Sequence, residues 1–137
     1  MARNADSLFG PARAPTYLKE WELGVSNPTL QRGTFSTNQG EAYIWAIDET
    51  GVAVLGQEVL APNAPGRYMT LGHPTLVNGG SARLAGELVP NGSGWILNTQ
   101  SGRYMQGASV GRDMIENAAD RLRQGGLRID AIDFGEV

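Results

Sequence analysis

Apolar residues along the first half of the chain predict a central β-hairpin. From Ala42 to Ile47, successive positions of both parities are apolar, which is typical of a strand covered on both faces. The Asp-Glu-Thr-Gly segment at 48–51 has the composition of a tight turn, and residues 52–55 return as a second apolar run. We therefore expect two adjacent antiparallel strands here.

Three further segments have the composition of strands. Residues 68–71 predict a short strand, and residues 82–89 predict a longer one. The longer strand ends at the Pro-Asn-Gly-Ser-Gly turn of 90–94, after which residues 95–98 run back. This is a second predicted hairpin.

The last third of the chain predicts one long helix and a closing strand. Apolar residues recur at helical spacing from Val110 to Leu122, with Ser109 as the expected N-cap and Gly125 as the stop. Alternating apolar residues at 127–131 then predict a strand. The order indicates an α+β fold: a mainly antiparallel sheet of about five to six strands, one long C-terminal helix and a closing strand.

Length and composition favour one compact domain. The 137 residues correspond to about one domain, and 19 glycines and 7 prolines suit a fold rich in loops. Residues 1–16 show no hydrophobic periodicity and are expected to form a flexible tail or linker. Residues 17–137 are expected to form a single domain.

The composition also excludes several kinds of chemistry. With no cysteine, disulfides, zinc-thiolate sites and thiol nucleophiles are ruled out, and a single histidine offers little for a metal site. We therefore expect no metal. A net charge of -3 argues against a general nucleic-acid coat, and no apolar run approaches the roughly 20 residues that cross a bilayer.

Glu87 is the first candidate for a functional residue. It is the only carboxylate between Glu58 and Asp113, in a stretch that also contains four arginines, at positions 67, 83, 103 and 112. Neighbouring arginines favour the ionised carboxylate, which suits a base or a group that stabilises a cationic transition state, while arginines suit anions. The alternative is a strand residue paired with a neighbouring arginine.

Two loop segments supply further candidates. His73 is the only imidazole and lies in the turn-prone segment 71–75; the alternative is a histidine that fixes the turn through the backbone. Ser101 and Gly102 would allow a ligand to approach the backbone closely, and Tyr104 offers a flat stacking face. The alternative there is a tight turn with a core tyrosine and a surface arginine.

The ordered set of these segments resembles a known family. Residues 40–137 resemble a domain found at the C-termini of polymorphic bacterial toxins and secreted effectors, and in the conserved region of plant IQ-motif calmodulin-binding proteins. In that family, an aromatic-rich hairpin precedes a His-Ser-Ser/Phe segment, a glycine pair, an Ala-Gly-Glu strand, a short hairpin, a Ser-Gly-His-Tyr box, a helix and a terminal strand. The matching positions are 43–56, His73, Gly79-Gly80, Ala85-Gly86-Glu87, Ser101-Gly102 and Tyr104, followed by the helix and strand. The sequence departs from the family at Pro74-Thr75, where the family has serines, and at Arg103, where it has histidine.

The resemblance implies a bacterial toxin or effector domain that a delivery system secretes into the cytoplasm of a target cell. Residues 1–16 would then be the junction to the delivery part. The implied partners are a target-cell protein or RNA and a cognate immunity protein. No membrane partner and a monomeric state are expected. The calmodulin-binding motif of the plant proteins is not visible, so that function is not implied.

The leading hypothesis is an enzyme that uses NAD as substrate, either an ADP-ribosyltransferase or an NAD glycohydrolase. In this hypothesis Glu87 stabilises the oxocarbenium-like charge, His73 bonds a ribose hydroxyl and Tyr104 stacks on nicotinamide. Arg83 or Arg103 would bind the diphosphate, beside the Ser101-Gly102 backbone.

Two alternatives remain open at the level of sequence. A metal-independent ribonuclease would use His73 and Glu87 as acid and base. A non-enzymatic binding module would use Trp21, Arg67 and Tyr68 as contact residues.

Overall fold

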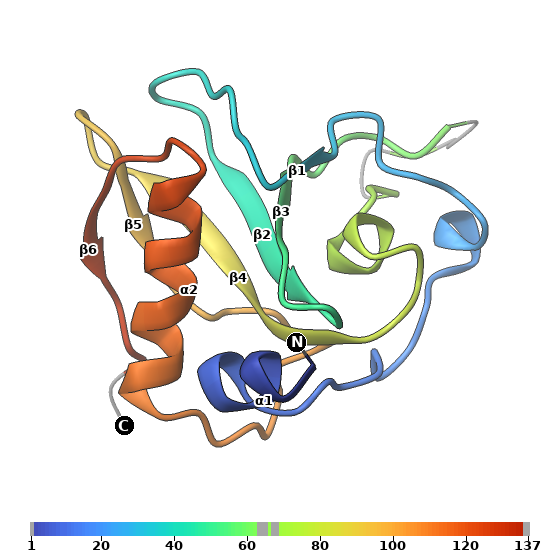
Figure 1. The fold of residues 1–137 in the computed structure, drawn as a ribbon. Helices are drawn as coiled ribbons and strands as arrows, with labels where there is room; N and C mark the ends of the chain where they lie inside the picture. Colours follow the sequence, from blue (N-terminus) through green and yellow to red (C-terminus); the bar gives the residue numbers. More distant parts are fainter. Residues whose placement is uncertain (1, 63–65, 67–68, 136–137) are drawn as a thin grey trace.

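A computed structural model describes residues 2–62, 66 and 69–135 and contains a six-stranded sheet with two α-helices and two short 3-10 helices (Figure 1). The helices are α1 (Ala2–Phe9), η1 (Glu20–Glu22), η2 (His73–Leu76) and α2 (Arg112–Gln124). The strands are β1 (Gln31–Arg32), β2 (Tyr43–Asp48), β3 (Ala53–Gly56), β4 (Ala82–Pro90), β5 (Trp95–Leu97) and β6 (Ile129–Ile132). The predicted α+β class is confirmed.

The sheet has the strand order β1-β3-β2-β4-β5-β6. All neighbouring strands are antiparallel except β5 and β6, which run parallel because α2 connects them. The central strand β2 is buried at all six positions, as the apolar run of both parities predicted. The predicted hairpins are β2–β3 and β4–β5.

The β2–β3 turn is held by one aspartate side chain. Asp48 Oδ1 accepts hydrogen bonds from the backbone N–H groups of Thr50 and Val52, each at 2.9 Å. Gly51 has a φ of 91°, a conformation that side chains disfavour. The turn predicted from the sequence therefore forms because Asp48 accepts these hydrogen bonds and Gly51 can adopt a positive φ.

Helix α2 lies across one face of the sheet (Figure 1) and buries one stripe of its surface. The buried residues are Ile115, Ala118, Ala119 and Leu122. The helix begins later than predicted: Gly111 occupies the N-cap position with extended backbone, and Ser109 lies outside the helix. The predicted stop at Gly125 is confirmed, since that residue is the C-cap.

The N-terminal segment differs from the flexible tail expected for residues 1–16. It forms α1, and Phe9 is only 1% exposed in the core. Arg13 forms a β-bridge with Ala82, and Thr16 N–H donates to Arg103 O at 2.8 Å. A helix this short depends on tertiary contacts for its stability, which a periodicity argument does not register.

Two local differences concern the sheet margins. The two-residue strand β1 had no sequence signal, since strands this short show no periodicity. In the segment 68–71, residue 68 lies outside the described residues, and Thr70 forms only an isolated bridge with Leu60. Across the described residues, no helix combines the length and apolar character that a membrane crossing requires.

Candidate functional site

Five of the seven predicted site residues meet at one hollow of about 190 Å³. They are His73, Glu87, Ser101, Gly102 and Arg103. The other described residues that line the hollow are Tyr17, Lys19, Ile44, Glu58, Gly72 and Gln100. Segments far apart in the sequence therefore converge on a single site.

His73 opens η2 and points its ring at β4. Its Nε2 atom lies 2.8 Å from the carbonyl oxygen of Gly86. The carbonyl can only accept, so Nε2 carries the proton in this hydrogen bond and Nδ1 is left with a lone pair. Burial lowers the pKa of His73 below its usual value and outweighs the opposing hydrogen bond to Gly86. His73 is therefore a neutral imidazole at pH 7, able to accept a hydrogen bond at Nδ1.

Glu87 lies on β4 directly opposite Ile44 of β2, so both side chains are on the same face of the sheet. Its Oε1 accepts a hydrogen bond from Asn98 Nδ2 at 3.1 Å. Within the described part of the chain, no arginine forms an ion pair with Glu87. The alternative interpretation of Glu87, a strand residue paired with an arginine, is not what these residues show.

Gly86 makes the position of Glu87 possible. A Cβ atom at Gly86 would lie 1.9 Å from the backbone oxygen of Asn98, so only glycine lets that segment pass this close to β4. The close approach also brings Asn98 Oδ1 to within 2.9 Å of the Glu87 N–H. Asn98 thus fixes both the backbone and the carboxylate of Glu87.

A buried ion pair ties three walls of the hollow together. The two guanidinium nitrogens of Arg103 contact the two carboxylate oxygens of Glu22 at 2.5 and 2.7 Å. Glu22 also accepts hydrogen bonds from the N–H groups of Gly72, at 2.8 Å, and Lys19, at 3.1 Å. One carboxylate therefore holds the segments that carry Lys19, His73 and Arg103.

The electrostatics of Glu22 follow from these contacts. Burial raises the pKa of the Glu22 carboxyl, but the hydrogen bonds from Arg103, Gly72 and Lys19 outweigh burial and leave the pKa below its usual value. The Glu22 side chain has 0% exposure and that of Arg103 has 8%. The pair is a fixed, internally neutral wall of the site.

Ser101 has the one buried hydroxyl among the described residues that lacks a hydrogen-bond partner. Its backbone oxygen is used, since it accepts from the N–H of Met105 at 2.9 Å. A buried hydroxyl without a partner costs free energy that a bound acceptor or donor would recover. Because the Ser101 hydroxyl is buried and not exposed to the hollow, the role expected for Ser101 in binding a ligand stays a prediction.

Tyr104 does not reach the hollow, contrary to its expected role as a stacking face. Its ring is 3% exposed, and its hydroxyl donates to the carbonyl of Gly80 at 2.8 Å. Burial raises the pKa of the Tyr104 phenol well above its usual value. The alternative of a core tyrosine is what the structure shows.

Neither arginine expected to bind a diphosphate is available for it. Arg83 lies at the other end of β4, where its guanidinium pairs with Asp6 and donates to the carbonyls of Gly10 and Glu49. Arg103 lines the hollow, but both terminal nitrogens bind Glu22. Arginines can be counted in the sequence, but the carboxylates that neutralise them are brought close only by the fold.

The structure adds residues that the sequence analysis did not assign to the site. Tyr17 lines the hollow and is 56% exposed, and its ring centroid lies 5.0 Å from the Arg103 guanidinium carbon. Glu58 and Lys19 also line the hollow. Their only sequence signal was residue type, because each comes from a segment without a motif.

Of the residues proposed as contacts for a binding module, Trp21 is the one that the structure describes. Its Nε1 atom donates to the carbonyl of Thr70 at 3.0 Å, so its polar edge serves the fold. Arg67 and Tyr68 lie outside the described residues.

The balance of charge defines what the hollow can do. Of the described charged residues that line the hollow, Arg103 is neutralised by Glu22, which lies outside the lining, and two carboxylates, Glu58 and Glu87, remain against Lys19. A site of this kind favours developing positive charge over a polyanion. Among the described residues, no group of three or more His, Cys, Asp or Glu side chains is placed to hold a metal ion.

Comparisons with protein-family models, curated proteins and solved structures found no match for this chain. The geometry of the site is therefore the basis for assigning a function.

Proposed function

We propose that this protein cleaves the N-glycosidic bond between nicotinamide and ribose in NAD, as a toxin or effector domain delivered into a target cell. The observation that carries the enzymatic part is the placement of Glu87 beside a neutral imidazole in a hollow with an excess of carboxylates. The delivery and the target cell rest on the family resemblance of residues 40–137.

The reaction places positive charge on the ribose as the bond breaks. The bonding electrons leave with the nicotinamide nitrogen, which becomes neutral, and the ribose carbon becomes oxocarbenium-like. The carboxylate of Glu87, held by Asn98, is suited to stabilise that charge. The bond is then completed to water or to another acceptor, whose proton passes to a carboxylate.

The neighbouring groups suit the rest of such a substrate. The Nδ1 atom of His73 can accept a hydrogen bond from a ribose hydroxyl. In place of Tyr104, the exposed ring of Tyr17 offers the stacking face for a flat heterocycle. Lys19 is the cation at the hollow for a phosphate group.

A ribonuclease is disfavoured by the same charges. RNA carries a negative charge on every nucleotide. In the hollow, a scissile phosphate would meet the carboxylates of Glu58 and Glu87, and of the two described cations that line it, Arg103 is already paired with Glu22, which leaves Lys19. NAD carries its positive nicotinamide ring at the bond that breaks, so the carboxylates assist there.

The test is incubation of the purified protein with NAD and, separately, with total RNA. Release of nicotinamide, measured by chromatography, without RNA cleavage is the expected result. Glu87→Gln should lower the rate by at least about 100-fold, since one electrostatic contact at a transition state is typically worth 10²–10³. Glu116→Gln, on the exposed face of α2, is the matched control and should leave the rate unchanged.

Three results would overturn the proposal: RNA cleavage without nicotinamide release, no turnover of either substrate, or full activity in Glu87→Gln. Growth arrest on expression in a bacterial cytoplasm, relieved by Glu87→Gln but not by Glu116→Gln, is the expected cellular result. Arrest that persists in Glu87→Gln would favour the binding module.

A further inference from the structure

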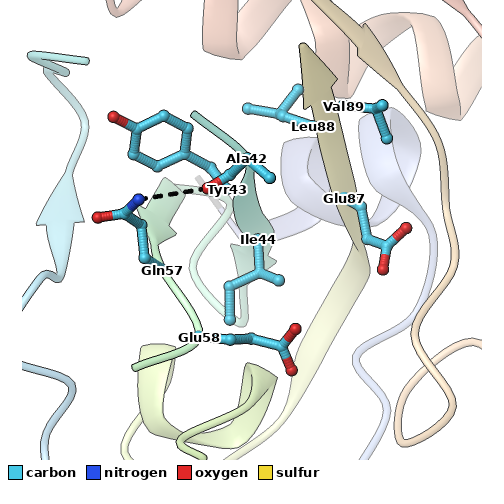
Figure 2. Close-up of a pocket in the computed structure, with 8 residues that line it drawn as sticks. All are labelled: Ala42, Tyr43, Ile44, Gln57, Glu58, Glu87, Leu88 and Val89. Atoms are coloured by element: carbon cyan, nitrogen blue, oxygen red, sulfur yellow. Dashed lines mark hydrogen bonds between the residues drawn. The ribbon is translucent and has the colours of Figure 1, made fainter. Parts of the chain in front are cut away.

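A second hollow, of about 330 Å³, adjoins the candidate site (Figure 2). The two hollows share three lining residues, Ile44, Glu58 and Glu87. Figure 2 shows the side chains of Glu58 and Glu87 directed toward the same space beside Ile44. The carboxylates therefore stand between two compartments, and Glu87 is accessible from both.

The second compartment, which we call the trough, differs in chemistry from the first. Its apolar lining includes the side chains of Ala42, Ile44 and Val89. Val89 is 43% exposed and lies two residues after Glu87 on β4, so its side chain is on the same face of the sheet as those of Glu87 and Ile44. Of the described residues that line the trough, none is basic.

The polar groups of the trough differ in whether they have hydrogen-bond partners. Gln57 is occupied, because its Nε2 atom donates to Glu41 Oε2 at 3.2 Å and to the carbonyl of Ala42 at 3.4 Å. Glu58 is exposed, and its carboxylate has no hydrogen-bond or ion-pair partner among the described residues. The trough thus offers an apolar wall that ends in an uncompensated carboxylate.

We propose that the trough is the acceptor subsite and binds the side chain of a lysine or arginine of a target protein, with Glu58 as the counter-ion. Both side chains combine an apolar stem of three or four methylene groups with a terminal cation. The stem would cover Ile44 and Val89, and the cation would reach Glu58, next to Glu87. This complementarity of shape and charge excludes acidic acceptors.

The transfer step rests on the proposed function, whereas binding of the cation does not. In the transfer, the bond from ribose to nicotinamide breaks and nicotinamide leaves as a neutral molecule with the electron pair. The acceptor nitrogen gives one proton to the Glu58 carboxylate and forms the new bond to the ribose carbon with its lone pair. Before the step, the nicotinamide ring and the acceptor each carry one positive charge and Glu58 carries one negative charge. After the step, the substituted acceptor carries one positive charge, while nicotinamide and protonated Glu58 are neutral, so the net charge is unchanged.

The binding test uses small mimics of the acceptor and no NAD. Nα-acetylarginine amide and Nα-acetyllysine amide are titrated into the isotope-labelled protein, with Nα-acetylcitrulline amide as the neutral analogue of similar shape. We expect the cations to shift the methyl resonances of Ile44 and Val89, and the citrulline derivative to bind more weakly. Glu58→Gln should weaken cation binding by about fivefold, the equivalent of an exposed ion pair of ~1 kcal/mol. The arginine and lysine arms show which cation is preferred.

Equal binding of the citrulline derivative, or unchanged cation affinity in Glu58→Gln, would overturn the subsite. The control variant Glu116→Gln should bind like the wild type. If the cations bind at the trough but NAD releases no nicotinamide, the subsite stands and the proposed function fails. If nicotinamide is released but no mimic gains ADP-ribose by mass spectrometry, the protein is a hydrolase and the acceptor role fails.

Discussion

The two buried arginines of the sheet region, Arg103 and Arg83, have equally hidden side chains, each 8% exposed, but very different partners. Arg103 pairs with Glu22, whose side chain has 0% exposure. Arg83 pairs with Asp6, whose side chain is 68% exposed. The burial of the carboxylate, more than that of the arginine, decides how much each ion pair contributes to the free energy of unfolding.

The two pairs also have different consequences for structure. Arg83 is supported by the carbonyls of Gly10 and Glu49 as well as by Asp6, and it fastens α1 to the end of β4. Arg103 shares its buried carboxylate with two backbone N–H groups from other segments. Removal of the Asp6 carboxylate should therefore loosen the attachment of α1 to β4, while removal of the Glu22 carboxylate should disassemble the candidate site.

Glu22→Gln is expected to have the largest effect. It leaves the Arg103 guanidinium buried without a counter-charge, which typically costs about 3–5 kcal/mol of the free energy of unfolding. Urea denaturation followed by circular dichroism measures this loss. In the double variant with Arg103→Met the orphaned charge is gone, so much of the stability should return. A loss in the single variant below about 1 kcal/mol would show that the pair is not the buried clamp described above.

Low pH should destabilise the folded protein through the carboxylate of Glu22. The pKa of Glu22 lies below its ordinary value of 4.5 in the folded state, so ionised Glu22 contributes stability above that value. This contribution is lost as the pH falls through the lower, folded pKa. The free energy of unfolding of the wild type should therefore drop more steeply below pH 4.5 than that of Glu22→Gln, as measured by urea denaturation at a series of pH values. Parallel curves for the two proteins would contradict this assignment.

Asp6→Asn is expected to have the smallest effect. Its carboxylate is mostly exposed, and Arg83 keeps its two carbonyl partners, so the loss should stay below about 1 kcal/mol. The same denaturation assay measures it, and nicotinamide release should be unchanged because Arg83 lies outside the hollow. A loss as large as that of Glu22→Gln would remove the distinction between the two pairs.

Local patterns predicted most of the sheet and the long helix. Three of these patterns each involve only a few neighbouring residues, so they can be recognised in the sequence. They are the apolar run of β2, the Asp48 turn and the helical spacing before Gly125. Helix α1 and strand β1 were missed because their stability comes from distant partners. Phe9 illustrates this, since its ring is buried in a core that the rest of the chain builds.

The site was predicted in part for the same reason. His73, Glu87 and Ser101 were found by their rarity or by the small residues around them. Tyr104 was assigned wrongly to stacking, because its hydroxyl is bound to Gly80 and no local pattern separates a core tyrosine from a rim tyrosine. The rim tyrosine is Tyr17, from a segment without a motif.

Residue patterns were enough to predict the class of fold, the two hairpins, the long helix and three of the polar groups at the hollow. Which charges remain available for chemistry depends on how the folded chain pairs them. Glu22 lies 81 positions from Arg103 and neutralises it, while Glu58 is left without a partner among the described residues. Ion pairing depends on distance in space and on exclusion of water, and neither quantity is encoded in the local order of residue types.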